Sequence, residues 1–315
     1  MDNQRHLLAC VVGGGLLLAG EAASAQPAPE TPSPLQSRVQ ELARSLRDSP
    51  RLKNLTEQQR IERVEFVIGN TLFVLLHEMG HLIIDEMKLP VLGRLEDTAD
   101  TFAALRMLTV GTSFALRGLS EASKGWFLND RRDQQTGAKP LYFLEHNLSQ
   151  QRAYQIVCLM VGSDPDKFKS LADEAKMPKA RQDTCKEDYA RAAASWEMVL
   201  KPHHRAADQP PVHIDVIYHE SEGRLAGFAR AFREIRMLEA VAQRAANDFA
   251  WPAPFALEMK ECGRPEAAWN DETNTLRICY DIAYDFAELY RAYVYDAPAQ
   301  PSRTQARRQS SNKTK

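Results

Sequence analysis

The sequence reads TLFVLLHEMGHLII over residues 71–84, and the polar residues inside this apolar run are the most informative feature of the chain. Positions i and i+4 of an α-helix share one face, so the imidazoles of His77 and His81 would project side by side. Two histidines at this spacing can bind one metal ion, with Glu78 beside them as a general base. Burying these three side chains without a partner would be costly, and a metal ion in a water-filled cleft removes that cost. The alternative is a buried helix that carries a hydrogen-bonded polar pair.

A catalytic zinc ion needs a third protein ligand and an open coordination position. Residues 92–103 read LGRLEDTADTFA, in which Glu96 and Asp100 are four residues apart and would share a helix face. One of them can bind the metal ion while the other orients a ligand histidine. A tight turn near Pro90 would place Asp100 level with His81, but a glutamate is longer, so we favour Glu96 as the ligand and keep Asp100 as the alternative. A solvated helix N-terminus, where the helix dipole favours acidic residues, would also explain both.

The oxyanion of a tetrahedral intermediate needs a hydrogen-bond donor near the metal ion. Glu145-His146 precedes a predicted helix at 148–162, and Arg152 lies on that helix. His146 is the first candidate for this catalytic role, and a surface histidine near a helix N-terminus is the alternative.

The N-terminus has the pattern of a secretory signal. Arg5 and His6 precede an apolar stretch at 7–20, and Ala23-Ser24-Ala25 fits the small-x-small cleavage rule. Cleavage after Ala25 would release the protein to a bacterial periplasm or to the outside. The stretch is short and rich in glycine, so we expect no stable membrane insertion after cleavage. A lipoprotein anchor through Cys10 is the alternative.

Five cysteines are present, and Cys10 would leave with the signal. An even number in an oxidising compartment predicts two disulfides. Proximity in sequence favours Cys158–Cys185 and Cys262–Cys279; a zinc site built from all four is the alternative, although no spacing is C-x-x-C. The net charge of -2 and the pI of about 6.5 do not show the excess of basic residues that is typical of nucleic-acid-binding proteins, so no nucleic-acid partner is expected.

The patterning predicts an α+β domain, mainly helical with a small sheet, over residues 26–296. Its first residues, 26–34, would be a proline-rich flexible leader, and a polar, basic, disordered tail would follow at 297–315. Thr56 and Gln59 predict a capping box that opens the helix of the histidine motif, with a break near Gly69-Asn70 left open. Helices are expected at 35–47, 56–88, 96–110, 148–162, 165–175, 187–200, 224–249 and 282–293.

Strands are expected at 212–218, 255–259 and 276–280, the last two as a hairpin around residues 270–274 that Cys262–Cys279 would staple. No strand precedes His77. The C-terminal half must therefore supply the sheet that packs on the helix of the histidine motif.

H-E-x-G-H followed by E-x-x-A-[DN]-x-F-A resembles the gluzincin arrangement of zinc peptidases, which implies a zincin-like fold. Carried over, the resemblance implies Glu96 as the third ligand and Asp100 as the hydrogen-bond partner of a ligand histidine. The mature chain is also similar to a bacterial family catalogued as metallopeptidases of unknown function. The similar stretches are 71–81, 89–94, 151–154, 162–165, 261–263 and 279–280. Where that family has Asn-Ala-Phe-Tyr after its E-C-G, this chain has Glu266-Ala267-Ala268-Trp269.

These observations predict an exported zinc metallopeptidase that hydrolyses peptide bonds in a peptide or protein. His77, His81 and Glu96 would hold Zn²⁺. Glu78 would take a proton from the attacking water and pass it to the leaving amine. The alternative is a metal-binding or interaction protein that keeps this fold without catalysis.

Overall fold

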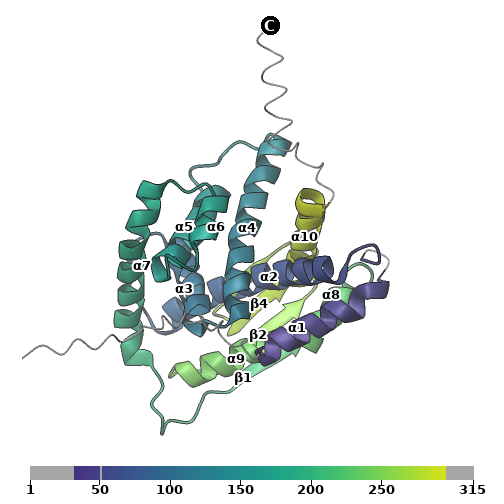
Figure 1. Cartoon of the computed structure of the whole chain (residues 1–315). Coiled ribbons are helices and arrows are strands. Elements are labelled where there is room, and N and C mark those ends of the chain that lie inside the picture. Colours follow the sequence, from purple (N-terminus) through teal and green to yellow (C-terminus); the bar gives the residue numbers. More distant parts are fainter. Residues whose placement is uncertain (1–31, 50–51, 296–315) are drawn as a thin grey trace, which may run out of the picture. The chain divides into compact units, whose positions relative to one another are not determined.

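The computed structural model describes residues 32–49 and 52–295 (Figure 1). The predicted signal peptide and the predicted tail lie outside these residues. The α-helices are α1 (Pro34–Ser45), α2 (Glu57–Glu86), α3 (Leu95–Val110), α4 (Ser113–Thr136), α5 (Ser149–Ser163), α6 (Lys169–Glu174), α7 (Lys179–Leu200), α8 (Ala226–Ile235), α9 (Met237–Asp248) and α10 (Tyr280–Tyr290). Short helical segments are η1 (Leu46–Asp48), η2 (Lys201–His203) and η3 (Arg291–Tyr295). The strands are β1 (Ile214–Tyr218), β2 (Phe255–Lys260), β3 (Ala267–Asn270) and β4 (Thr275–Cys279), so the predicted mainly helical α+β class is confirmed.

Helix α2 begins with the predicted capping box. The Thr56 hydroxyl accepts from the Gln59 amide at 3.2 Å, and the Gln59 side chain accepts from the Thr56 amide at 2.9 Å. The helix then runs for 30 residues without a break at Gly69-Asn70. Gly69 allows close packing instead, because a Cβ added there would lie 2.7 Å from Gly118 Cα on α4. The Asn70 amide donates to Phe66 O at 2.8 Å and to Glu121 O of α4 at 2.9 Å, so both residues bind the neighbouring helix.

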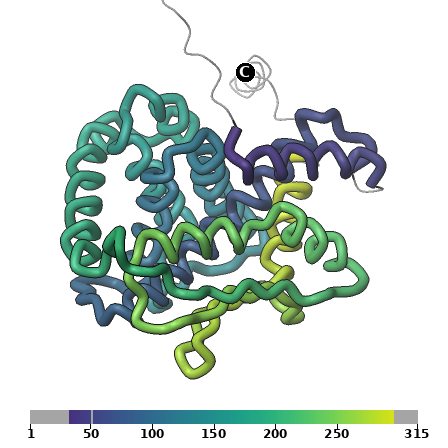
Figure 2. The backbone as a smooth tube through the Cα atoms, turned by 90° about the horizontal axis from the view of Figure 1, so that it is seen from below, coloured from purple at the N-terminus to yellow at the C-terminus, as the bar shows by residue number. Residues whose placement is uncertain are grey.

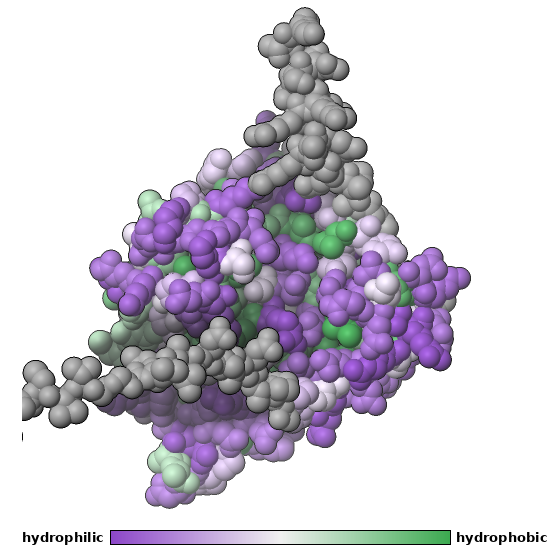
Figure 3. All heavy atoms as spheres, viewed as in Figure 1, coloured by the Kyte–Doolittle hydropathy of each residue, from purple (hydrophilic) through white to green (hydrophobic). Residues whose placement is uncertain are grey.

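Helix α2 is also the one helix, among residues 32–49 and 52–295, that is long and apolar enough to cross a membrane. Within the protein, 72% of its apolar window is buried, which is typical of a core helix. On the face that Figure 3 shows, hydrophilic side chains predominate and hydrophobic ones form small separate patches.

Helix α4 was not expected from the sequence. The Thr112 hydroxyl accepts from the Ala115 amide at 3.3 Å at its start, and Gly137 ends it with φ 71°. Its buried face includes Gly118, Ser123 and Asn129 beside the apolar residues, which weakens the hydrophobic periodicity.

The expected helix at 224–249 is two helices, which corrects the prediction. Arg236 lies between α8 and α9 in the left-handed region with φ 56°. The Tyr218 hydroxyl accepts from the Leu238 amide at 2.9 Å, which satisfies a free donor at the start of α9. The break is therefore stabilised by a contact with β1 that local sequence does not reveal.

The sheet has the order β1-β2-β4-β3. Strands β1 and β2 are parallel, β2 and β4 are parallel, and β3 is antiparallel to β4. The predicted hairpin of 255–259 with 276–280 is therefore wrong, because β4 forms its hairpin with the short strand β3. Strand β3 (AAWN) carries one large apolar side chain, too weak a pattern for it to be recognised as a strand.

All four strands follow residue 213, and β3 and β4 pack on α2 as the sequence predicts. Figure 2 shows the blue and teal helices on one side and the green to yellow chain of the C-terminal half passing beneath them. Trp269 Nε1 on β3 donates to Asp85 Oδ2 on α2 at 3.1 Å. The described residues from Pro32 onward form one compact unit.

Both disulfides have the expected pairing. Cys158–Cys185 joins α5 to α7, and Cys262–Cys279 joins the segment after β2 to the end of β4. The second bond therefore links two neighbouring parallel strands, not the two strands of a hairpin. With all four cysteines bonded in pairs, the alternative four-cysteine zinc site is excluded.

Candidate active site

The two motif histidines meet on one face of α2. Their Nε2 atoms lie 3.1 Å apart and their ring centroids 4.8 Å apart. His77 is buried and His81 is half-buried, because α3 covers this face of α2. Gly80 permits that cover, since a Cβ there would lie 3.1 Å from Ala99 Cα on α3.

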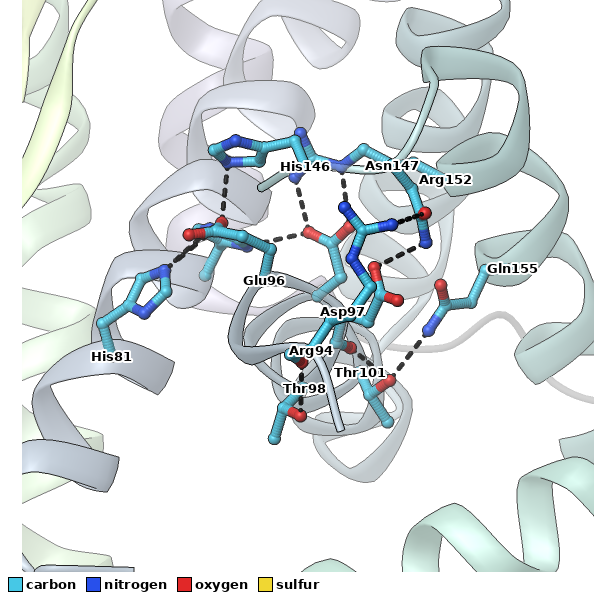
Figure 4. A network of polar contacts seen from close by, with 12 residues as sticks. His81, Arg94, Glu96, Asp97, Thr98, Thr101, His146, Asn147, Arg152 and Gln155 are labelled. Atoms are coloured by element: carbon cyan, nitrogen blue, oxygen red, sulfur yellow. Dashed lines mark hydrogen bonds and ion pairs between the residues drawn. The ribbon is translucent and has the colours of Figure 1, made fainter. Parts of the chain in front are cut away.

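Glu96, in the first turn of α3, faces both histidines, and Figure 4 shows its carboxylate next to His81. Its Oε2 lies 3.1 Å from His77 Nε2 and 3.5 Å from His81 Nε2. In a tetrahedral zinc site with bonds of about 2.0–2.2 Å, ligand atoms lie about 3.3–3.6 Å apart. The spacing of these three donor atoms therefore fits a single zinc-sized cation.

Asp100 contacts the other ring nitrogen of His77. His77 Nδ1 lies 2.8 Å from Asp100 Oδ1, and Arg152 donates to the same carboxylate from Nε at 2.7 Å and from Nη2 at 2.6 Å. Burial alone would raise the pKa of Asp100, but the charge of Arg152 and the hydrogen bonds from His77 and Arg152 lower it. The ionised carboxylate only accepts hydrogen bonds, so His77 Nδ1 carries a proton, and Nε2 is the ring nitrogen that could bind a metal ion.

Nε2 of His77 lies 3.1 Å from Glu96 Oε2, and a lone pair on Nε2 would be repelled by the carboxylate unless a proton or a cation lay between the two atoms. Burial alone would lower the pKa of His77, but hydrogen bonds to Asp100 and Glu96 outweigh it and raise the pKa to about 9. Burial likewise opposes ionisation of Glu96, yet hydrogen bonds from His146, His77 and His81 hold its pKa well below the usual range. The donor set therefore favours a positive charge at its centre, which is the requirement of a cation site.

Glu78 lines the same cleft, a cavity of about 670 Å³. Burial raises the pKa of its carboxyl, and the neighbouring His77 and His81 oppose this shift. A glutamate with a raised pKa beside a cation site is suited to accept a proton and return it. The cleft is lined by residues of α2, the 84–96 segment, the α4–α5 loop and β3: His77, Glu78, His81, Ile84, Asp85, Lys88, Leu89, Leu95, Glu96, His146, Ala267, Ala268 and Trp269.

His146 reaches the cation site from the loop between α4 and α5. Its Nε2 lies 2.7 Å from Glu96 Oε2, and its ring stacks against that of His77 with centroids 5.8 Å apart. Ligand atoms of His77, Glu96 and His146 all lie within 4.8 Å of one another, which makes them a possible metal-binding group. The sequence placed His146 among the catalytic candidates but gave no signal that it contacts Glu96.

Arg152, the other cation considered for the oxyanion, is not among the residues that line the cleft. It is 6% exposed, it is bound to Asp100, and its guanidinium lies 3.7 Å from the centre of the Trp126 ring. Arg152 therefore positions Asp100, and through it His77.

A second contact that the sequence did not reveal ties the His146 loop to α3 (Figure 4). Arg94 donates to Asn147 Oδ1, to Leu144 O and to Glu145 O, each at 2.6 Å. The Asn147 amide in turn donates to Asp97 Oδ1 at 2.6 Å. These hydrogen bonds fix both residues that flank His146.

The comparisons with known proteins agree with this geometry at the level of the family. A family model described as "Putative metallopeptidase" matches residues 36–200, just over half of the 315-residue chain, and this region contains α2, α3 and the His146 loop. Neither the curated proteins nor the solved structures gave a match. On this match over more than half its length, the chain belongs to that metallopeptidase family.

Proposed function

We propose that the protein is an exported, zinc-dependent metallopeptidase that hydrolyses peptide bonds. One observation carries the proposal: the Nε2 atoms of His77 and His81 and the Oε2 of Glu96 converge at 3.1–3.5 Å from one another, with Glu78 in the same cleft. Two nitrogens and one oxygen at this spacing suit zinc, and with these three residues as its only protein ligands a fourth position would be left for water or substrate.

Each side chain then has a role. His77, His81 and Glu96 would hold the zinc ion, and Asp100 would keep the proton on Nδ1 of His77. When bound, zinc supplies Lewis-acid chemistry, polarising the scissile carbonyl and lowering the pKa of a water molecule. Glu78 would take the proton of the attacking water and deliver it to the leaving amine. His146 would donate from its imidazole to the oxyanion that forms on the carbonyl.

The walls of the cleft favour an extended peptide as substrate. Strand β3 lies at the edge of the sheet, paired on one side only with β4, and its residues Ala267, Ala268 and Trp269 line the cleft. An edge strand presents unpaired backbone groups to which an extended peptide can add as a further strand.

Export is supported by both disulfides, which persist in extracellular or periplasmic proteins and are rare in the cytosol. The apolar stretch at 7–20 and the cleavage pattern ending at Ala25 support the same compartment.

The test combines zinc quantitation with cleavage of a peptide library by the mature chain. Wild type should contain one zinc ion per chain and cleave peptides. Glu78→Gln should keep zinc and fold but lose cleavage, because an amide cannot act as a base. His77→Ala should lose zinc, whereas His213→Ala, an exposed histidine outside the cleft, should change neither readout.

Equal cleavage by wild type and Glu78→Gln would refute the mechanism. Stoichiometric zinc without cleavage of any peptide would favour the alternative of a metal-binding protein that does not catalyse. A wild-type chain that binds no metal would exclude both the zinc peptidase and the non-catalytic metal-binding protein.

A further inference from the structure

Exposed hydrophobic side chains gather beside the candidate active site. Eleven large hydrophobic residues are exposed in the described part of the chain, and six of them lie on two segments next to the cleft. We call these six residues the apolar lip: Leu92, Leu95, Leu141, Tyr142, Phe143 and Leu144. Exposed apolar side chains are normal when scattered, whereas several on two adjoining segments are a candidate interaction surface.

Hydrogen bonds join the two segments of the lip, 92–95 and 141–144, to each other and to the candidate active site. Arg94, between Leu92 and Leu95, donates to the backbone carbonyl of Leu144 at 2.6 Å. Asn147 is bound to both Arg94 and Asp97, which fixes the end of the loop. The lip therefore has a defined position relative to His146, while Tyr142 and Phe143 at its tip are 80% and 83% exposed.

The lip is continuous with the cleft. Leu95 belongs to the lip and also lines the cleft with Glu96 and His146. The apolar side chains of Leu89, Ile84 and Trp269 line the same cleft. An extended peptide bound in the cleft beside Glu78 could therefore leave the cleft across the apolar lip.

The charges near the lip favour a polypeptide over an anionic membrane surface. Residues 137–148 contain one lysine, Lys139, and one glutamate, Glu145. Arg94 is already engaged in three hydrogen bonds. Binding to anionic lipids usually needs a cluster of lysines and arginines, and this loop has none.

We propose that the apolar lip binds large apolar residues of an extended polypeptide whose scissile bond lies in the cleft. This inference rests on the proposed function of the cleft and names its substrate class: unfolded or flexible segments rich in leucine and aromatic residues. Such segments are buried in folded proteins, so the enzyme acts on chains that have lost or not yet reached their folded state.

The experiment measures binding separately from cleavage. The full mature chain with Glu78→Gln is loaded with zinc and titrated into a fluorescein-labelled unstructured peptide with a central Leu-Phe-Leu-Tyr run. A second peptide carries serine at those four positions. The double variant Tyr142→Ser/Phe143→Ser should weaken binding of the apolar peptide by about tenfold or more, because two large side chains no longer bury apolar area.

The control is Met198→Ser on α7, a residue that is 75% exposed and not part of the lip, and it should bind the apolar peptide like the parent. The serine peptide should bind weakly to every variant. Unchanged affinity of the double variant for the apolar peptide would overturn the proposal. So would a double variant that loses only binding to phosphatidylglycerol vesicles, or only self-association in sedimentation.

Cleavage assays on wild type and on Tyr142→Ser/Phe143→Ser, both with Glu78 intact, distinguish a failure of the lip proposal from a failure of the peptidase assignment. If the lip binds the apolar peptide but wild type cleaves nothing, the peptidase assignment fails and the binding surface stands. If wild type cleaves the apolar and serine peptides with equal kcat/KM, and Tyr142→Ser/Phe143→Ser does the same, the lip proposal fails and the peptidase assignment stands.

Discussion

Arg152 forms a bidentate ion pair with the carboxylate of Asp100, with Nε 2.7 Å from Oδ2 and Nη2 2.6 Å from Oδ1. The pair is almost fully buried, with Arg152 6% and Asp100 3% exposed. On one side Arg152 stacks on the Trp126 ring, and on the other Asp100 accepts from His77. A chain of contacts from α4 through α5 and α3 thus fixes the ring of His77 on α2, which keeps its Nε2 directed at Glu96.

Removing the arginine should destabilise the protein strongly. Arg152→Met leaves the Asp100 carboxylate buried without its main partner, which typically costs about 3–5 kcal/mol. The measurement is urea unfolding of the metal-free chain. Adding Asp100→Asn to Arg152→Met should recover part of the loss, because the uncompensated charge is gone.

The matched control is Arg181→Met, which removes an arginine from a half-exposed ion pair with Asp188 on α7. Such exposed pairs contribute about 1 kcal/mol or less. Equal losses in the two arginine variants would contradict the assigned role of Arg152.

Helix α2 and its neighbour α3 could be predicted from the sequence because the information is local. The i, i+4 spacing places His77 and His81 on one face, and Glu96 follows within one helix connection. Glu96 is the residue whose Oε2 faces both Nε2 atoms, at 3.1 and 3.5 Å, and its role as the third ligand stays a prediction. The turn between α2 and α3 is wide enough to bring the first turn of α3 to the histidines.

The partners Arg152 and Arg94 could not be predicted in the same way. Arg152 contacts Asp100 across 52 residues, and Arg94 contacts the loop of His146 across about the same span, so both contacts depend on how α4 turns the chain back. That helix was missed because small and polar residues occupy its buried face. Strand β3 was missed because its apolar pattern is short, and the strand pairing was therefore misassigned.

The close contact of α2 with α4 gives a test of the packing. A Cβ at position 69 would lie 2.7 Å from Gly118 Cα and 2.8 Å from Gly118 O, and neither backbone atom can rotate away. Gly69→Ala should therefore destabilise the protein by about 1–3 kcal/mol or more, despite the better helix propensity of alanine. Thermal unfolding measures the change.

Gly227→Ala on α8 is the matched control, since a Cβ there would meet no atom within 4 Å. It should leave the unfolding temperature unchanged or raise it slightly, because alanine favours helix by up to about 1 kcal/mol. A Gly69→Ala variant as stable as this control would show that α2 and α4 are farther apart than described.

Glu121 on α4 predicts how stability depends on pH away from the cation site. Burial raises the pKa of its carboxyl above the ordinary value of 4.5; Lys124 opposes the shift, and Glu65 and Glu62 add to it. The folded state therefore binds this proton more tightly than the unfolded state does. The resulting stabilisation is fully present below pH 4.5 and is lost as the pH rises through the folded-state pKa.

At neutral pH the buried charge is thus unfavourable, so Glu121→Gln should raise the free energy of unfolding there. This difference in free energy of unfolding between Glu121→Gln and wild type should shrink as the pH falls toward 4.5 and below, where the wild-type side chain is also neutral. Urea unfolding at several pH values measures the difference. Glu187→Gln, in an exposed pair with Arg191, should shift stability by only a few tenths of a kcal/mol (~0.3–0.5). A constant difference between Glu121→Gln and wild type at all pH values would contradict the assigned pKa direction.

The roles of Glu96 and Asp100 can be ranked by zinc affinity. Glu96→Ala removes the oxygen that faces both Nε2 atoms, whereas Asp100→Asn keeps a side chain that can still accept from His77 Nδ1. Loss of a partner behind a ligand costs about 10–100-fold in affinity, and loss of the ligand itself should exceed that. Competition with a chromogenic chelator gives both values. Asp97→Asn, on the same helical turn as Glu96 but bonded to Asn147, should bind zinc like wild type. If Asp100→Asn weakened zinc more than Glu96→Ala, Asp100 would be the ligand, and His77 would have to turn its ring to present Nδ1 in place of Nε2.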